Sequence, residues 1–309
     1  MPRVLLVETC TTPRPPANDL AAEHRIRHAL ALESVVDARR GAARGARRDV
    51  RGGELALFGI PLGAAFLARP LRKHGIDVVH EPLVLHAAAG RDPLAALAEA
   101  LWRERPDVLG LTINHAMEES VGLAMARVAK AATPEVRVVL GGLHATFRAE
   151  VLAGDAAVDA VVRFEGEASF PLCVDWLTGR GDADDVPGLV ARGPQGLRAV
   201  PPGPHVSFAR MRPDYDAVRA DEYVRAGVLA HVQTSRGCPY ECHFCCHTTF
   251  WGRRVRKRDA GLVAEEITDL LGRGCDLVYL TDSTFTIDRR RVRTLCDAFV
   301  AHGADRATF

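Results

Sequence analysis

The sequence predicts an α/β protein in which a doubly wound parallel sheet is followed by the start of a second β/α alternation. Three observations support this fold class. Short apolar runs alternate with segments of helical period up to about residue 180. A stretch rich in turn-forming residues interrupts this pattern over residues 181–227. The alternation then resumes at residue 228 and continues to residue 309.

The first unit, residues 1–180, contains five apolar runs of strand length, separated by longer segments. The expected strands are 3–8, 76–80, 107–113, 136–142 and 158–164. The expected helices are 61–75, 92–104, 118–132, 144–154 and 167–179. Continuous apolar strands that alternate with helices are typical of a parallel sheet covered on both faces. Residues 11–60 are expected to form one long connection, with a helix near 19–33 and an Arg/Gly-rich mobile loop at 38–53.

The rest of the chain divides into a connecting segment and a second unit. Residues 181–227 contain frequent turn signals and are expected to form a small hairpin and a linker. In the second unit, residues 228–309, the alternation resumes. Its expected strands are 228–235 and 276–282, its expected helices are 259–274 and 288–303, and a third strand is expected to start at 306–309.

Composition and charge exclude several classes of protein. The 309 residues include 40 Lys and Arg against 39 Asp and Glu, a balance that argues against a general nucleic-acid or membrane-surface binder. The chain contains no run of about 18 apolar residues, which a transmembrane helix needs. Its apolar N-terminal stretch is too short for a signal peptide and is better explained as a strand. We therefore expect a cytoplasmic protein with reduced thiols.

Four of the eight cysteines fall within nine residues, in the segment TSRGCPYECHFCCHTTFWG. Cys238, Cys242 and Cys245 have the spacing C-x3-C-x2-C. Where thiols stay reduced, such a cluster predicts a metal site, and soft thiolates select zinc or iron–sulfur clusters. Three cysteines on one loop would hold three irons of a four-iron cluster and leave the fourth iron open for a substrate.

Two other interpretations of this loop stay open. A structural zinc site would recruit Cys246, His243 or His247 as its fourth ligand. Alternatively, the thiols would form a buried cluster without a metal. We expect Cys246 to be a bystander outside the motif. The other cysteines are expected to be small core residues: Cys10, Cys173, Cys275 and Cys296.

The cysteine segment resembles the radical S-adenosylmethionine (radical SAM) superfamily, because Phe244 precedes the last cysteine of the motif and TSRG precedes the first. The resemblance implies a partial (β/α) barrel and a [4Fe-4S] cluster on Cys238, Cys242 and Cys245. In that family the open iron binds SAM, and a 5′-deoxyadenosyl radical abstracts hydrogen after one-electron cleavage. The resemblance further implies SAM contacts from Phe244 and Asp282 and an electron donor such as flavodoxin or ferredoxin. For Asp282, a loop or helix-capping carboxylate is the alternative.

Residues 1–180 resemble the cobalamin-binding domain that is fused to radical SAM enzymes. The segments that carry the resemblance are PLGAAFLARPLRKHGIDV, PDVLGLT, VVLGGLHAT and EGE, in that order. Ligands of an open parallel sheet bind beyond the carboxyl ends of its strands. The resemblance implies cobalamin contacts there from Thr112, Gly141 and Gly142. No Asp-x-His-x-x-Gly segment follows the first strand, so we expect no histidine ligand on the lower cobalt face.

Some residues near these motifs have simpler explanations. Phe164 stands where the family usually has glycine, and a bulky side chain there is expected to crowd the nucleotide tail of cobalamin. Glu165 and Glu167 are expected to pack against the second domain or to lie at a helix N-terminus. Asn114 is expected to be structural or solvated. The basic run is expected to form a solvated face: Arg253, Arg254, Arg256, Lys257 and Arg258.

These inferences favour a cobalamin-dependent radical SAM enzyme that transfers a methyl group to an unactivated carbon of a small molecule or peptide. Two alternatives stay open: cyclisation or rearrangement with the same cofactors, and a corrinoid-binding protein without catalysis. The expected domains are 1–180, 181–227 and 228–309. A six-unit partial barrel needs roughly 190 residues, whereas 64 follow Cys245, so we expect the N-terminal part of a longer enzyme.

Overall fold

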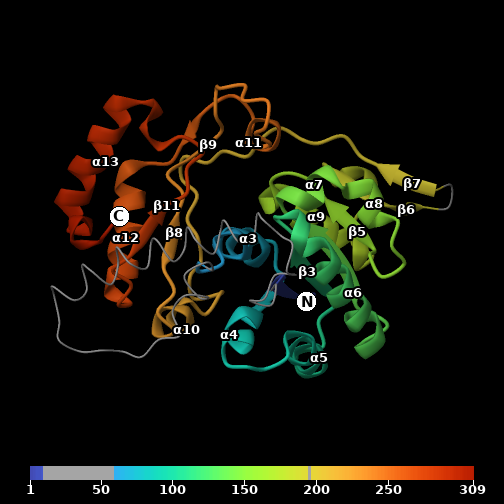
Figure 1. Cartoon of the computed structure of the whole chain (residues 1–309). Coiled ribbons are helices and arrows are strands. Elements are labelled where there is room, and N and C mark those ends of the chain that lie inside the picture. Colours follow the sequence, from blue (N-terminus) through green and yellow to red (C-terminus); the bar gives the residue numbers. More distant parts are fainter. Residues whose placement is uncertain (10–58, 194–195) are drawn as a thin grey trace.

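The computed structural model describes residues 1–9, 59–193 and 196–309. It shows two α/β parts side by side, one formed mainly before residue 200 and one after it (Figure 1). The helix expected near 19–33 and the mobile loop expected at 38–53 lie outside the described residues. The other strands and helices expected before residue 180 are present, one helix as two short pieces. The predicted α/β fold class is therefore confirmed.

A seven-stranded sheet with the order β2-β1-β3-β4-β5-β6-β7 forms the centre of the first part. The strands are β1 (Arg3–Glu8), β2 (Asp77–His80), β3 (Val108–Thr112), β4 (Arg137–Gly141), β5 (Ala160–Val162), β6 (Leu189–Gly193) and β7 (Gly196–Ala199). The first five are parallel, and β6 and β7 pair antiparallel. Val4, Leu5, Leu6 and Val7 of β1 are each at most 4% exposed, so both faces of the sheet are covered. Burial of each such side chain stabilises the fold by about 1.5–3 kcal/mol.

The helices of the first part cover both faces of this sheet. They are α3 (Leu62–Lys73), α4 (Leu83–Ala88), α5 (Pro93–Glu104), α6 (Glu119–Ala132), α7 (Leu143–Phe147), α8 (Ala149–Ala153) and α9 (Gly166–Leu177). Helix α3 packs against α9, and α5 packs against α6. Because the chain moves from β1 outward to β2 and then back past β1 to β3, right-handed crossovers place these two helix pairs on opposite faces.

Two helices differ from the expectation. The helix expected at 144–154 is interrupted at Arg148, which separates α7 from α8. Helix α4 was not expected, because six residues after Pro82 are too few to show a helical period. Local signals do mark several other helices. Asp92, Asp259 and Asp288 each cap a helix by accepting hydrogen bonds from backbone N–H groups of its first turn.

The hairpin expected within 181–227 is formed by β6 and β7, and it extends the parallel sheet. Val190 of β6 pairs with Val161 of β5 in an antiparallel register. Arg163, just after β5, donates hydrogen bonds to the carbonyl oxygens of Gly188 and Val200 at 3.1 and 2.7 Å. The hairpin is thus held against the first part. The boundaries 1–180, 181–227 and 228–309 stay predictions.

The second part begins a new β/α alternation. Its elements are α10 (Ala220–Arg225), β8 (Ala230–Val232), β9 (Ser235–Arg236), α11 (His247–Trp251), β10 (Arg256–Lys257), α12 (Ala260–Gly272), β11 (Val278–Leu280) and α13 (Arg289–His302). Strands β8 and β11 are parallel with α12 between them in the chain, and β9 pairs antiparallel with β10. In place of the strand expected at 306–309, Thr308 forms a single parallel bridge with Leu277. Short 3-10 turns occur at Ala116–Glu118, Ala183–Asp185, Phe285–Ile287 and Ala304–Arg306.

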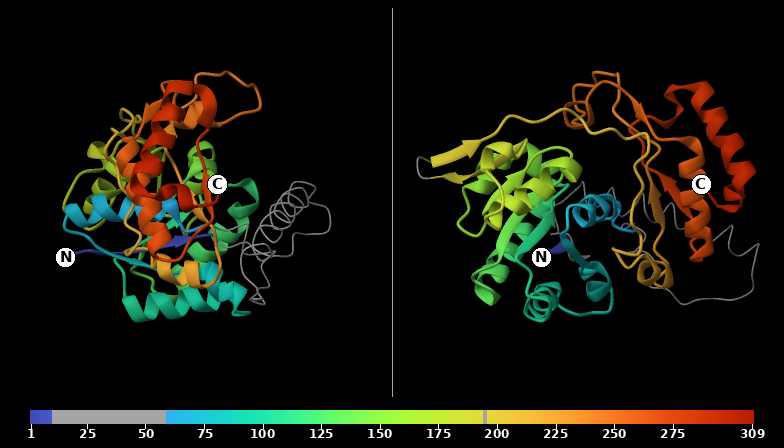
Figure 2. Two further views of the ribbon diagram at one scale, coloured as in Figure 1. Left: turned by 90° about the vertical axis from the view of Figure 1, so that its left-hand side faces the viewer. Right: turned by 180° about the vertical axis from the view of Figure 1, so that it is seen from behind.

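Helix α3 lies between the two parts (Figure 2). The backbone N–H of Ile60, just before α3, donates to the carbonyl oxygen of Leu229 at 3.3 Å. The Asp214 carboxylate forms a salt bridge with Arg72 and accepts a hydrogen bond from it at 2.7 Å. The backbone N–H of Asp214 donates to the Ala65 carbonyl oxygen at 2.9 Å. These contacts hold the second part against the first. In the described ranges, no helix is long and apolar enough to cross a bilayer.

Candidate cofactor-binding site

The carboxyl ends of the parallel strands form one edge of the sheet, and the crossovers leave β1 and β3 in opposite directions. Such a switch point is where open α/β sheets bind ligands. Glu8 ends β1 and pairs in register with Thr112, which ends β3. Thr112 in turn pairs with Gly141 at the end of β4. The strand register therefore brings two of the predicted cobalamin residues together at this edge.

The turn after β4 requires glycine at one of its two positions. Gly142 has a φ of +100°, and a Cβ atom there would lie 2.7 Å from the carbonyl oxygen of Ile113. A Cβ atom on Gly141 would meet only the Val162 carbonyl oxygen, at 3.6 Å. Asn114 accepts a hydrogen bond from the Leu143 N–H at 3.1 Å, as expected of a structural residue. Gly142 thus shapes the turn, whereas Gly141 leaves the edge of the sheet open.

Glu8 is a further polar group at this edge, and no sequence motif marks it. Burial, helped by the charge of Glu118, raises the pKa of Glu8 to about 8. Its carboxyl group is therefore mostly protonated at neutral pH and is able to donate a hydrogen bond. The only sequence signal was an acidic residue at the end of an apolar strand.

Thr112 offers a second polar group at the same edge. Its carbonyl oxygen accepts a hydrogen bond from the Thr9 hydroxyl at 2.9 Å. Its own hydroxyl makes no hydrogen bond to the part of the chain that the structure describes. An open backbone at Gly141 and polar groups at the neighbouring ends of β1 and β3 fit a large ligand that lies across the edge, such as a corrinoid.

Phe164 lies just beyond this edge and faces the second part. Its φ of +64° lies in the left-handed region, which explains why glycine suits this position. Its N–H donates to the Thr146 hydroxyl at 2.8 Å, and that hydroxyl donates to the Gly142 carbonyl oxygen at 2.9 Å. The ring centroid of Phe164 lies 6.1 Å from that of Phe250 in α11. Its side chain therefore takes part in a contact between the two parts.

The cysteine loop starts directly after β9. A Cβ atom on Gly237, whose φ is +95°, would lie 2.3 Å from the carbonyl oxygen of Arg254, so this position requires glycine. The N–H of Cys238 donates to the Gly252 carbonyl oxygen at 3.1 Å. Cys238 is buried, Cys245 is half-buried and Cys242 is exposed. Outside the loop, the expected core position is confirmed for Cys173 and Cys275 and wrong for Cys296, which is exposed, and Cys10 lies outside the described residues. Phe244 between them is 93% exposed.

The chemistry of this donor set fits an iron–sulfur cluster. The three thiols lie on one loop, and each of them is free. A zinc ion needs four donors at about 2.0–2.3 Å. Over residues 1–9, 59–193 and 196–309, the structure contains no group of three His, Cys, Asp or Glu side chains gathered for one metal ion. The same absence holds for Cys238, Cys242 and Cys245, so the geometry does not separate the cluster from the zinc alternative with Cys246, His243 or His247.

Asp282 follows β11 and lies beside the end of β8. One of its carboxylate oxygens accepts a hydrogen bond from the Thr234 N–H, and the other accepts bonds from the Thr234 and Ser235 hydroxyls, all at 2.6 Å. Asp282 thus fixes the segment that leads into the cysteine loop. Its contact with SAM stays a prediction.

A group of ionisable residues, all but one of them largely buried, joins the sheet edge to the cysteine loop. We call it the bridging ion cluster, and it consists of Glu165, Glu167, Arg236, Arg256 and His205. The Arg236 guanidinium lies 2.8 Å from a Glu165 carboxylate oxygen and 2.7 Å from one of Glu167. Arg256 donates to Glu165 at 2.9 Å, and His205 also lies 2.9 Å from it. The expected packing of both glutamates against the second domain is confirmed.

The expectation of a solvated basic run after the cysteines is wrong for two of its members. Arg256 is largely buried in the bridging ion cluster. The Arg258 side chain is fully buried and pairs with Glu266, which also accepts a hydrogen bond from Tyr215 at 2.8 Å. Glu165 lies 91 positions from Arg256, and Glu266 lies eight positions after Arg258 in α12, so the run by itself did not reveal these partners. The other members of the run are exposed: Arg253, Arg254 and Lys257.

Comparison with known proteins shows which protein family the chain resembles. Residues 48–174 match the family model described as the B12 binding domain. An uncharacterized methyltransferase of Pyrococcus horikoshii is 32% identical over 239 residues, which are 75% of this chain and 50% of the relative. Hopanoid C-3 methylase of Methylococcus capsulatus is 30% identical over 248 residues, 79% of this chain and 46% of the relative. An anaerobic magnesium-protoporphyrin IX monomethyl ester cyclase of Rubrivivax gelatinosus is 29% identical over 261 residues, 81% and 46% of the two chains.

Solved structures show the same fold. The radical SAM methyltransferase TsrM from Kitasatospora setae, with tryptophan and a SAM analog bound, matches 96% of this chain with a TM-score of 0.67. Its sequence is 19% identical, and the match covers 50% of TsrM. The cobalamin-dependent SAM radical enzyme OxsB, with aqua-cobalamin and SAM bound, matches 97% of this chain with a TM-score of 0.68, at 16% identity and 37% coverage of OxsB.

The fold and the site define a B12-binding α/β protein with an attached cysteine loop. The chain belongs to the family of radical SAM proteins that carry a B12-binding domain. It spans about half the length of the curated relatives that it matches.

Proposed function

We propose that the chain belongs to a cobalamin-dependent radical SAM enzyme that transfers a methyl group to an unactivated carbon. The observation that carries this proposal is the attachment of the cysteine loop to the carboxyl edge of the sheet. Glu165, which follows β5, pairs at 2.8 Å with Arg236, two residues before Cys238. A cluster held on this loop would stand beside a corrinoid held on that edge. Relatives named as methyltransferases support methyl transfer as the reaction.

The proposal gives roles to eight residues. Cys238, Cys242 and Cys245 would hold a [4Fe-4S] cluster, and Phe244 and Asp282 would contact SAM. Thr112, Gly141 and Gly142 would contact cobalamin. When bound, the cluster and SAM supply one-electron chemistry, and the corrinoid supplies the methyl group.

The described residues contribute orientation and protection from water. Cys238 is 8% exposed, so the first thiol of the loop is shielded by protein. Gly142 holds the turn after β4 close to Ile113, and Gly141 keeps the edge free of side-chain bulk. Asp282 ties the ends of β8 and β11 together through Thr234 and Ser235. Fixed geometry of this kind matters because a displacement of about 1 Å at reacting groups can cost roughly 100-fold in rate.

The remaining parts of the proposal concern partners and location. The substrate would be a small molecule or a peptide, and an electron donor such as flavodoxin or ferredoxin would reduce the cluster. We propose no nucleic-acid or membrane partner and a cytoplasmic location. Free cysteines throughout the described ranges support a reducing compartment.

A second candidate is cyclisation or rearrangement with the same cofactors. A cyclase among the relatives of similar identity favours keeping it. Binding of a corrinoid without catalysis is the remaining alternative. Turnover of SAM to 5′-deoxyadenosine would separate both enzymatic candidates from this last one.

Anaerobic reconstitution of the full chain with iron and sulfide tests the proposal directly. We expect a brown protein that contains one four-iron cluster. Replacement of Cys238, Cys242 or Cys245 by Ala should abolish the cluster, because each thiolate holds one iron. Cys246→Ala is the matched control, since Cys246 is exposed and adjacent to the motif, and it should retain the cluster. Tight binding of one zinc ion without iron would refute the iron–sulfur assignment.

A further inference from the structure

The bridging ion cluster lies between the two parts of the chain, and all its members except His205 are largely buried. None of its members is among the eight residues given roles above. Its carboxylates come from the segment after β5, and its guanidinium groups come from β9 and β10. The side chains of Glu165 and Arg236 are each 3% exposed, and that of Glu167 is 8% exposed. Charges so far from water persist only when they are paired with good geometry. Here two carboxylates face two guanidinium groups, so the cluster is balanced.

The Arg236 guanidinium is also held by aromatic rings. It lies 4.3 Å from the ring centroid of Phe208, 4.6 Å from that of Trp251 and 5.1 Å from that of Phe66. Its Nε donates to the Gln233 side chain at 2.9 Å. Stacking on rings and paired carboxylates together fix the plane of the guanidinium. Arg236 therefore has little freedom to move relative to the first part.

A single residue separates Arg236 from Cys238, so the backbone between them allows little independent movement. Two residues span at most about 7 Å, and Gly237 between them packs directly on the Arg254 carbonyl oxygen. The Cys238 N–H is bonded to Gly252, which follows α11. A shift of Arg236 would consequently move the Cys238 thiol. The position of this thiol is thus coupled to a carboxylate on the B12-binding part.

We propose that Glu165 and Arg236 form a positioning pair that sets the place of Cys238, and with it the cysteine loop, relative to the carboxyl edge of the sheet. The pair acts through the loop and touches neither cofactor nor substrate. The consequence for an iron–sulfur cluster rests on the proposed function. The consequence for the thiol itself does not, because the contacts are present in the protein alone.

Labelling of the protein without cofactors tests the coupling by itself. The full chain is treated with iodoacetamide, and the rate at Cys238 is followed by mass spectrometry. In Glu165→Gln we expect labelling of Cys238 to be about tenfold faster than in the wild type, because local opening of the loop becomes easier by that factor. The rate at the exposed Cys246 should stay unchanged and serves as the internal control.

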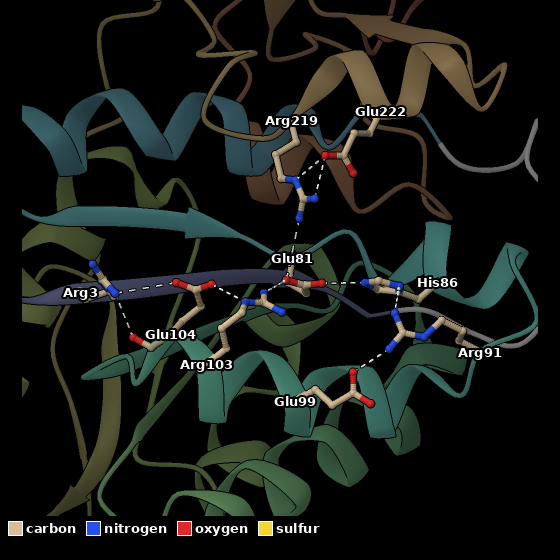
Figure 3. Close-up of polar contacts among 9 residues, drawn as sticks. All are labelled: Arg3, Glu81, His86, Arg91, Glu99, Arg103, Glu104, Arg219 and Glu222. Carbon is tan, nitrogen blue, oxygen red and sulfur yellow. Dashed lines mark hydrogen bonds and ion pairs between the residues drawn. The ribbon is translucent and has the colours of Figure 1, made fainter.

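Glu81 offers a matched control variant. It is a buried carboxylate at 4% exposure that binds His86 at 2.6 Å, Arg103 at 2.7 Å and Arg219 at 3.9 Å (Figure 3). Its partners lie on α4, on α5 and before α10, at the opposite end of the molecule from β9 and α11 (Figures 1 and 2). In Glu81→Gln, iodoacetamide should label Cys238 as slowly as in the wild type. Two results would overturn the proposal. One is that Glu81→Gln accelerates labelling of Cys238 as much as Glu165→Gln does, and the other is that folded Glu165→Gln labels Cys238 at the wild-type rate.

Arg236→Lys provides a second variant in case Glu165→Gln does not fold. Lysine keeps the buried charge but loses the planar fork and the stacking on the rings, so the same faster labelling is expected. After reconstitution, the electron paramagnetic resonance (EPR) spectrum of the reduced cluster should shift on addition of SAM in the wild type and in Glu81→Gln. That shift should be lost in Glu165→Gln and Arg236→Lys, and its retention in both would count against the pair. If the wild type formed no cluster after reconstitution, the proposed function would be refuted. The labelling rates at Cys238 would still test the positioning pair, because they need no cluster.

Discussion

Glu165 accepts a hydrogen bond from Arg236 at 2.8 Å, although 71 positions of the sequence separate the two residues. Both side chains are almost completely buried, and the contact connects the end of β5 with the strand that leads into the cysteine loop. One ion pair thus links the two halves of the proposed cofactor site.

This pair predicts a specific dependence of stability on pH. Burial raises the pKa of Glu165, but the hydrogen bonds and charges of Arg256 and Arg236 outweigh it and leave the pKa below its ordinary value. A lowered carboxyl pKa stabilises the fold above the unfolded value near 4.5, and this stabilisation is lost as the pH falls through the folded value. Glu165→Gln should therefore cost about 3–5 kcal/mol at pH 7 and less below pH 4. Thermal unfolding at both pH values measures this, and an equal cost at both would contradict the account.

The sequence predicted the strands and the cysteine motif better than it predicted the charged contacts. Apolar runs such as Val4–Val7 identify a buried strand locally, because both faces of a central strand are covered. The partners of Arg256 and Arg258 could not be found in this way, since a basic run shows its charge but not which glutamates it pairs with. Glu8 was missed for the same reason, because its raised pKa depends on how the sheet edge is covered.

Replacement of Gly142 should be much more harmful than replacement of its neighbour. In Gly142→Ala the new Cβ would lie 2.7 Å from the Ile113 carbonyl oxygen, at a φ of +100°, so the turn after β4 must distort. We expect a loss of about 1–3 kcal/mol in the free energy of unfolding, measured in urea. Gly141→Ala is the control, because its Cβ would only reach ordinary contact distance at 3.6 Å. Equal losses in the two variants would show that the strained turn is not the cause.

Glu8 predicts the opposite pH dependence from Glu165. Its pKa of about 8 in the folded protein lies above the ordinary value of 4.5, so the folded state binds an extra proton between these values. Stability contributed by this proton is present at low pH and is lost as the pH rises towards 8. Glu8→Gln cannot lose a proton at this position, so it escapes the loss of stability that the wild type shows at high pH. At pH 9 its free energy of unfolding should exceed that of the wild type by at most about 5 kcal/mol. Urea unfolding at pH 5 and pH 9 measures the difference.

Glu119→Gln is a suitable comparison for Glu8→Gln. Hydrogen bonds from His144 and Arg148 lower the pKa of Glu119, so its charged form is the stabilising one. This variant should gain no stability at high pH. A gain in both variants would trace the effect to the net charge of the protein and not to the half-buried Glu8 carboxyl at the sheet edge.

The lower face of a bound corrinoid should carry no nitrogen ligand from the protein. The segment that follows β1 begins with Thr9 and carries no Asp-x-His-x-x-Gly pattern, so no histidine is expected to bind the cobalt from the sheet edge. Cob(II)alamin bound to the full chain should give an EPR spectrum without nitrogen splitting from the protein. Labelling the protein with ¹⁵N separates protein nitrogen from the nitrogen of cobalamin itself, and labelled and unlabelled protein should give the same spectrum. A change in splitting on labelling would establish a protein ligand, and no uptake of corrinoid would remove the cobalamin assignment of Thr112, Gly141 and Gly142.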